Sequence, residues 1–386
     1  MYIGLDIGGT NMVAGLTNGA GKIINKVSRP VNKAWDPAEL CRQSAQLAQQ
    51  AAEVGGFAAD QIKAVGLGLP GLVDNKTGYV IQTPNMPFDN TPIREMFQAE
   101  WDVPVYLGND ANCAAIGEYW AGAAKDCDPA VVVTLGTGIG GGLVVGGKLY
   151  TGFAQSGLEV GHMIIRPNGV LCGCGNRGCW EQYGSATALI RIAQEAMERD
   201  PGSVMWELCQ GDRFRVDGRI PFQAARLGDL SAKKVLHRYL EGLSIGLINL
   251  VNILQPEIIC LGGGISNAED DLLLDPLRGL VLAGCFDKSK PPRLERASLG
   301  NDAGVVGAAM LYKMLYGPGS RPGEPRWNMN RAASADAEAA SACGKSSPVR
   351  NSATRRRRNK SLISSFPRAC TSGMTVSPPI AWLAGS

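Results

Sequence analysis

The sequence predicts an α/β protein built from two similar lobes that face a cleft. Apolar runs with the periodicity of strands alternate along the chain with longer segments of helical periodicity, which is the pattern of α/β folds. In addition, a unit of strand, glycine-rich turn and strand begins at residue 2 and again about 127 residues later. One copy lies near the start of each half, which indicates an internal repeat.

In the first half, the apolar runs 2–7 and 12–17 flank Gly8-Gly9-Thr10-Asn11 and predict a β-hairpin. Residues 36–54 predict a helix, with Asp36 as N-cap, Pro37 in the first turn and a Gly-Gly pair as the stop. The other elements expected in this half are strands at 22–28, 62–69 and 103–107 and helices at 92–100 and 110–121.

In the second half, residues 130–135 and 141–145 predict another hairpin, around the glycine-rich turn 136–140. The other elements expected here are helices at 185–199, 221–227, 229–254 and 302–315 and a strand at 257–261, which Gly262-Gly263-Gly264 closes.

The last part of the chain, residues 319–386, differs in composition from the rest. It holds eleven basic and three acidic residues, a formal charge of +8, whereas residues 1–318 carry −5. Apolar periodicity vanishes, and residues 355–358 are four consecutive arginines. Such a run suits either contact with nucleic acid or a solvated tail, and the second is the commoner case. A disordered basic tail is therefore expected, either as a genuine extension or as an out-of-frame one, with no specific nucleic-acid partner.

The amino-acid composition and the first residues indicate which class of protein to expect. Hydrophobic residues make up 45% and charged residues 19%, which excludes a wholly disordered chain. The longest apolar stretch, at 243–254, is shorter than the ~20 residues that span a bilayer. The first residues include an acid at position 6 and no basic segment, unlike a signal peptide. These features predict a soluble, cytoplasmic protein.

Two glycine-rich turns are candidates for phosphate binding. In the first, Gly8 and Gly9 would let backbone N–H groups approach phosphate oxygens, Thr10 adds a donor, and Asp6 could hold Mg²⁺ through water. The alternative is an ordinary hairpin turn. The second turn matches G-x-G-x-x-G, but a strand follows it where a dinucleotide site needs a helix. A second phosphate-holding hairpin at Gly136, Thr137 and Gly138 is expected instead.

An acidic residue begins the helix expected at 110–121. Asp110 follows Asn109 directly after a strand. It could be an ordinary N-cap. Because α/β sheets bind ligands at the carboxyl ends of their strands, it could also be a general base.

One histidine and three cysteines have the spacing of a metal site. His162, Cys172, Cys174 and Cys179 match a tetrahedral Cys₃His zinc site, and nearby glycines free the backbone to fold around an ion. Because the protein fills all four positions, the zinc is expected to be structural. The alternative is a set of buried cysteines that lie together without a metal. The other histidine, His237, is expected on a helix surface without a role.

Together, these motifs resemble the ROK family (repressors, open reading frames and sugar kinases), and within it the bacterial ATP-dependent glucokinases. The resemblance covers residues 1 to about 318 and rests most specifically on Glu159-x-Gly-His162 and Cys172-x-Cys174-Gly-x-x-Gly-Cys179-x-Glu181. It implies the two-lobed actin-like/hexokinase ATPase fold, with ribonuclease H-like repeats. The lobes would comprise residues 1–120 with 302–318, and residues 121–301.

The resemblance also implies roles for individual residues. Asp110 would be the catalytic base that takes the proton from the sugar 6-hydroxyl. The other residues implied to bind sugar are Asn85, Asn109, Glu159, His162 and Glu181. Those implied to bind ATP are Asp6, Gly8, Gly9, Thr10, Gly136, Thr137, Gly138, Gly262, Gly263 and Gly264.

The function implied is transfer of a phosphoryl group from ATP, with Mg²⁺, to the 6-hydroxyl of a hexose, glucose before others. Alternatives are a kinase for fructose, mannose, N-acetylmannosamine or allose, or a sugar-sensing regulator without turnover, against which the intact Asp110 and glycine turns argue. The resemblance further implies a homodimer or homotetramer.

Overall fold

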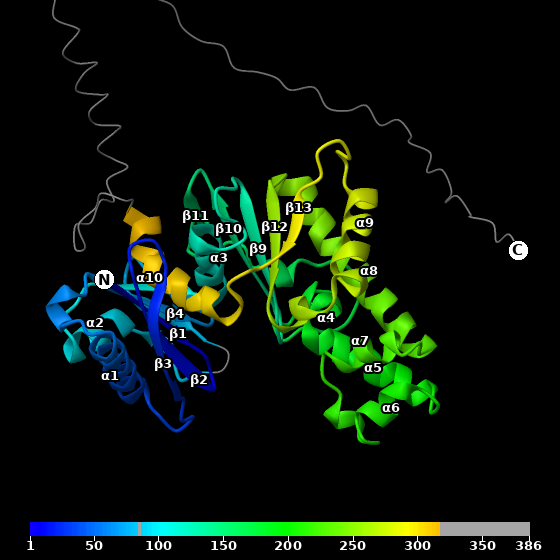
Figure 1. The fold of residues 1–386 in the computed structure, drawn as a ribbon, viewed down its shortest axis with the longest axis horizontal. Coiled ribbons are helices and arrows are strands. Elements are labelled where there is room, and N and C mark those ends of the chain that lie inside the picture. The colour runs from blue at the N-terminus through cyan, green and yellow to red at the C-terminus, as the bar shows by residue number, and fades with distance from the viewer. Residues whose placement is uncertain (84–85, 317–386) are drawn as a thin grey trace, which may run out of the picture. The chain divides into compact units, whose positions relative to one another are not determined.

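The computed structural model describes residues 1–83 and 86–316, so that Asn85 and the tail expected at 319–386 lie outside it. The first sheet has the strand order β3-β2-β1-β4-β8 (Figure 1). Strands β3, β2 and β1 are antiparallel, and β1, β4 and β8 are parallel. These strands are β1 (Tyr2–Ile7), β2 (Asn11–Thr17), β3 (Ile23–Pro30), β4 (Ala64–Leu69) and β8 (Val105–Asn109).

The second sheet repeats this topology with the order β11-β10-β9-β12-β13. Its first three strands are again antiparallel and its last three parallel. The strands are β9 (Ala130–Leu135), β10 (Ile139–Val145), β11 (Lys148–Tyr150), β12 (Ile258–Gly262) and β13 (Arg293–Arg296). The predicted internal repeat is thus confirmed, because both glycine-turn hairpins occupy the same place in their sheets.

Each sheet shares an apolar core with its own helices. The core of the first sheet includes α1 (Pro37–Val54) and α2 (Ile93–Glu100). The predicted start of α1 is confirmed, since the Asp36 carboxylate accepts the N–H of Glu39 at 2.8 Å. The core of the second sheet includes α5 (Ala186–Arg199), α7 (Ile220–Arg226), α8 (Leu230–Leu254) and α9 (Leu274–Gly284).

Two helices lie between the sheets and pack against each other (Figure 1). Helix α3 (Asp110–Ala121) lies on β9 and β10, and α10 (Ala303–Tyr316) lies on β1 and β4. The approach of α10 is so close that a Cβ at Gly66 of β4 would lie 1.8 Å from the carbonyl oxygen of Ala308. Only glycine allows helix and sheet to meet at this distance.

Several short elements were absent from the sequence-based expectations. They are β11, β13, α9, α4 (Glu181–Gly184), α6 (Val204–Leu208), and a small sheet of β5 (Leu72–Asp74), β6 (Tyr79–Gln82) and β7 (Asp89–Thr91). Most span too few residues to show a hydrophobic period, and α9 is the longest of them. Short 3-10 helices occur at Ala59–Gln61, Val160–His162, Arg213–Arg215, Gly264–Asn267, Asp270–Leu272 and Gly300–Asp302. Within the described ranges, no helix combines the length and apolar character needed to cross a membrane.

Candidate active site

Several of the candidate residues lie at or just after the carboxyl ends of strands in the two sheets. In the first sheet, β1 ends just before the first glycine turn and the parallel β8 ends at Asn109. In the second sheet, β9 ends just before the second turn and the parallel β12 ends at Gly262. Because parallel strands end at the same edge, each sheet gathers its candidate residues at one edge, where α/β proteins bind ligands.

The first turn is a tight hairpin with a carboxylate at its base. The N–H of Gly8 donates to the carbonyl oxygen of Asn11 at 3.0 Å, and Thr10 is exposed. Asp6 lies against the start of α10, since a Cβ at Gly304 would be 2.7 Å from its Oδ2. Burial, and then the charge of Asp110, raise the pKa of Asp6 to about 6. The Asp110 carboxylate is thus close enough to influence the charge of Asp6.

The raised pKa of Asp6 predicts an effect on stability. A carboxyl whose pKa is raised by folding favours the folded state when protonated, and this advantage is lost as pH rises from about 4 to about 6. Asp6→Asn should therefore raise the free energy of unfolding at pH 8 by about 1–2 kcal/mol, and by much less at pH 3.5. Urea denaturation at both pH values measures this, with the exposed Asp102→Asn as control. An equal effect at both pH values would contradict it.

Asp110 is the first residue of α3, but it is not the helix cap. The Oδ1 atom of Asn109 caps the helix by accepting the N–H groups of Ala111 at 2.9 Å and Asn112 at 3.2 Å. The ordinary N-cap role considered for Asp110 is thus wrong. Asn109 also donates to the carbonyl oxygen of Gly71 at 3.0 Å, so much of its side chain is engaged within the protein.

The Asp110 carboxylate is left available for chemistry. Asp110 is exposed, yet the protein around its carboxyl group displaces water and raises its pKa. Hydrogen bonds act in the opposite direction, including the N–H of Ala111 at 2.8 Å from Oδ1. An aspartate with a raised pKa at a strand-to-helix junction suits proton transfer.

The second and third glycine segments lie side by side. In the second, the N–H of Gly136 donates to the carbonyl oxygen of Gly138 at 3.1 Å, and Thr187 Oγ1 donates to that of Thr137 at 2.8 Å. In the third, Gly263 has a φ of +85°, and a Cβ there would lie 2.4 Å from the carbonyl oxygen of Leu135. The Gly262–Gly264 segment therefore touches the residue that leads into the second turn.

Two glutamates connect this turn to the other candidate residues. A Cβ at Gly138 would lie 2.6 Å from Oε2 of Glu181, so this carboxylate borders the second turn. Burial raises the pKa of Glu159; His162 lowers it, and the charges of Asp110 and Glu181 raise it further. Asp110 and Glu181 are thus close enough to Glu159 to influence its charge, as expected for groups that bind the same small molecule.

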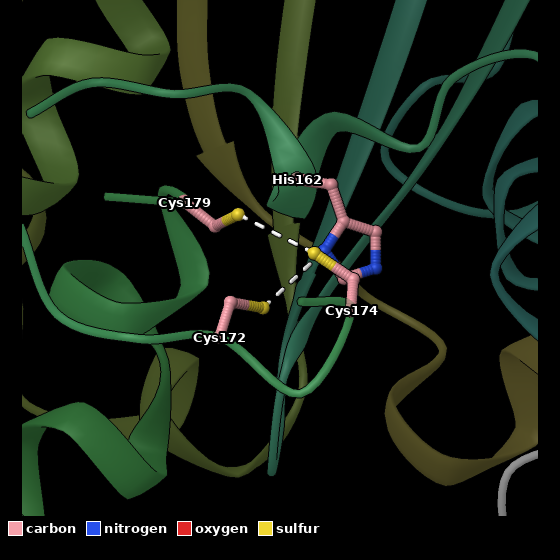
Figure 2. A group of neighbouring side chains, drawn as sticks. All are labelled: His162, Cys172, Cys174 and Cys179. Carbon is pink, nitrogen blue, oxygen red and sulfur yellow. Dashed lines mark hydrogen bonds between the residues drawn. The ribbon is translucent and has the colours of Figure 1, made fainter. Parts of the chain in front are cut away.

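The His-Cys group forms a compact cluster (Figure 2). Its four ligand atoms all lie within 4.8 Å of one another; the sulfurs of Cys174 and Cys179 are 3.6 Å apart, and Cys172 Sγ is 3.7 Å from His162 Nδ1. Zinc–ligand bonds of ~2.0–2.3 Å in a tetrahedron require separations of roughly 3.3–3.8 Å between ligand atoms. These residues therefore fit a zinc ion.

The backbone around the cluster explains why these ligands converge. The N–H of Cys172 donates to the carbonyl oxygen of Asn176 at 2.8 Å, which closes the loop. Gly178 has a φ of +86°, and a Cβ there would lie 1.8 Å from the carbonyl oxygen of Arg166. The fully buried Trp180 donates through Nε1 to the carbonyl oxygen of Gly242 in α8 at 3.1 Å. The cluster is thus anchored to the core of the second sheet.

Glu181 is also the link between this cluster and the glycine turn. Its Oε1 accepts the Cys172 thiol at 2.9 Å and lies 3.9 Å from His162 Nδ1, while its Oε2 borders Gly138. In Figure 2 the second ring nitrogen of His162 points away from the sulfurs. The sequence signalled each of these residues, but not the contacts of Gly304 with Asp6 and Gly138 with Glu181.

Comparison with known proteins identifies relatives that match most of this chain. The model of the ROK family matches residues 2–314. The glucokinase of Streptomyces coelicolor is 36% identical over 81% of this chain and 98% of its own length. The xylose repressor of Caldicellulosiruptor bescii is 31% identical over 67% of this chain and 64% of its own length. A crystal structure of a ROK family glucokinase from Streptomyces griseus, in complex with glucose and AMPPNP, matches with a TM-score of 0.69 and 34% identity, over 80% of this chain and 98% of that one.

Proposed function

The chain belongs to the ROK family, and we propose that it is an ATP-dependent hexokinase that phosphorylates the 6-hydroxyl of glucose. Its fold is the two-lobed actin-like ATPase fold, with the strand order of one sheet repeated in the other. Among the residues described, the observation that carries the proposal is the contact of Glu181 with the second glycine turn, together with the electrostatic influence of Asp110 and Glu181 on Glu159.

The glycine segments would hold the nucleotide. The first and second turns present backbone N–H groups to the phosphates of ATP, with Thr10 as an added donor, and Gly262, Gly263 and Gly264 approach the adenosine. Asp6, at the base of the first turn, suits a water-mediated interaction with Mg²⁺, which neutralises phosphate charge when bound. Phosphoryl transfer asks the protein mainly for this positioning and charge neutralisation.

The carboxylates would hold and activate the sugar. We place Asp110 at the 6-hydroxyl, where it orients the attacking oxygen and takes its proton. Glu159 and Glu181 accept hydrogen bonds from other hydroxyls, and Asn109 and His162 add polar contacts; Asn85, outside the described residues, is kept in the same role. His162 and the three cysteines would hold a structural zinc, which would help to fix the orientation of the neighbouring glutamates.

The proposal also covers the division of the chain into lobes and its oligomeric state. The division into lobes of residues 1–120 with 302–318, and 121–301, is supported by the packing of α10 on β1 and β4, while α3 contacts both sheets at the boundary. A homodimer or homotetramer in the cytoplasm completes the proposal, with closure of the lobes excluding water, which would compete with the sugar as acceptor.

A coupled assay of ADP release tests the proposal directly. The purified chain with Mg²⁺ and ATP should show its highest kcat/KM with glucose among glucose, mannose, fructose, N-acetylmannosamine and allose. The analogue 6-deoxyglucose, which lacks the acceptor hydroxyl, should release no ADP above background. A higher kcat/KM with another hexose would replace glucose as the substrate. Binding of glucose without turnover of any sugar would instead indicate a regulator.

A further inference from the structure

One buried carboxylate lies outside the site described above. Glu118, in α3, is fully buried. Its Oε2 accepts the N–H of Ala123 at 2.8 Å and that of Ser298 at 3.0 Å, with the Ser298 hydroxyl at 3.3 Å. Its Oε1 accepts the N–H of Leu299 at 2.7 Å. Three backbone donors and one hydroxyl thus surround this side chain, and a buried carboxylate needs such a set of hydrogen bonds.

These donors lie on both connections between the two sheets. In its described part the chain passes from the first sheet to the second through α3 and residues 122–129, and Ala123 lies in this segment. It returns through residues 297–302 into α10, which packs on the first sheet, and Ser298 and Leu299 lie in this second segment. Glu118 therefore joins two segments about 175 residues apart in the sequence.

Each connection adjoins a helix that reaches the proposed active site. Helix α3, which carries Glu118, begins at Asp110, two turns earlier. Helix α10, which follows Leu299, carries Gly304, the residue that lies against Asp6. The helices touch between these points, since a Cβ at Gly117 would lie 2.2 Å from the carbonyl oxygen of Ala303. A shift of one segment against the other would thus move Asp6 relative to Asp110.

We propose that Glu118 is a positioning residue that holds the two connections together and so sets the placement of Asp6 relative to Asp110. This inference rests on the proposed kinase function, because it assigns Glu118 to alignment for phosphoryl transfer. Alignment matters for such a reaction, since a displacement of about 1 Å can cost ~100-fold in rate. Glutamine at this position keeps the size but turns an NH₂ group toward backbone donors, so that hydrogen bonds are lost on one side.

The test is Glu118→Gln, assayed well below its unfolding temperature. We expect kcat per folded molecule to fall about 10- to 100-fold, with the Kd for glucose, measured by calorimetry, within about threefold of wild type. Leu247→Ala is the matched control, because Leu247 is fully buried in the second core, away from both connections. This variant should lose stability without losing kcat per folded molecule. An unchanged kcat in Glu118→Gln, or a loss no larger than in the control, would overturn the proposal.

A second variant covers the case in which Glu118→Gln does not fold. Leu299→Pro removes a single N–H donor at a residue whose φ of −85° is near that of proline. It should lower kcat in the same way, and full kcat would overturn the proposal. If wild type phosphorylates no sugar, the proposed function fails. Amide hydrogen exchange then tests by itself whether Glu118 holds the two connections together. Faster exchange at Ala123 and Leu299 in Glu118→Gln, without change in α5, supports the coupling, and unchanged exchange rejects it.

Discussion

Replacing Asp110 by asparagine is expected to lower kcat at least about 100-fold, the lower end of what a general base contributes. Glucose affinity should stay within about threefold, because asparagine keeps the shape and one oxygen of the side chain. The fold should also survive, since Asn109 rather than Asp110 caps α3. Steady-state kinetics with glucose and ATP, together with calorimetric glucose binding, measure both quantities.

The pH profile gives an independent check on the same residue. Only the carboxylate can accept the hydroxyl proton, so kcat/KM of wild type should fall as the pH falls through the pKa of Asp110. Because this pKa is raised, the fall should begin at a higher pH than for an ordinary aspartate. Asp36→Asn, at the N-cap of α1, serves as the control and should keep wild-type kcat. Full activity of Asp110→Asn would remove Asp110 from the mechanism.

Loss of the proposed zinc site is expected to have the second large effect. Cys174→Ala removes the exposed ligand of the cluster and should abolish stoichiometric zinc binding. Glucose affinity should fall about 10- to 100-fold, the usual cost of losing support around a metal ligand, because zinc would no longer fix His162 and Cys172, the two ligands that lie next to Glu181. Far-UV circular dichroism should change little, since each sheet has an apolar core of its own.

Elemental analysis and calorimetry check this result. Wild type should contain about one zinc per chain, and Cys41→Ala, a buried cysteine outside the cluster, should retain both zinc and glucose affinity. Wild-type protein without zinc would refute the metal assignment. A Cys174→Ala variant that lacks zinc yet binds glucose normally would refute the positioning role of the cluster.

The local features of this protein were predictable from the sequence by itself. The two glycine turns, the Asp36 cap of α1, the helix at 110–121 and the His-Cys cluster all appear in the structure. Each depends on residues within about twenty positions of one another, whose hydrogen bonds and backbone preferences act over that range. The internal repeat was predicted from two such turns set about 127 residues apart, and the structure shows it as the same strand order in both sheets.

The tertiary structure decided the contacts between distant segments. The sequence left open whether Asp110 caps its helix, and the geometry assigned that role to Asn109. Nothing near Glu118 in the sequence indicates that Ser298 and Leu299 hold its carboxylate, or that Gly304 lies against Asp6. Such contacts depend on how two sheets and the helices between them pack, and packing joins residues that share no local pattern. The residues that supply the chemistry of the site could therefore be predicted from the sequence. The placement of these residues relative to one another is determined only by the folded chain.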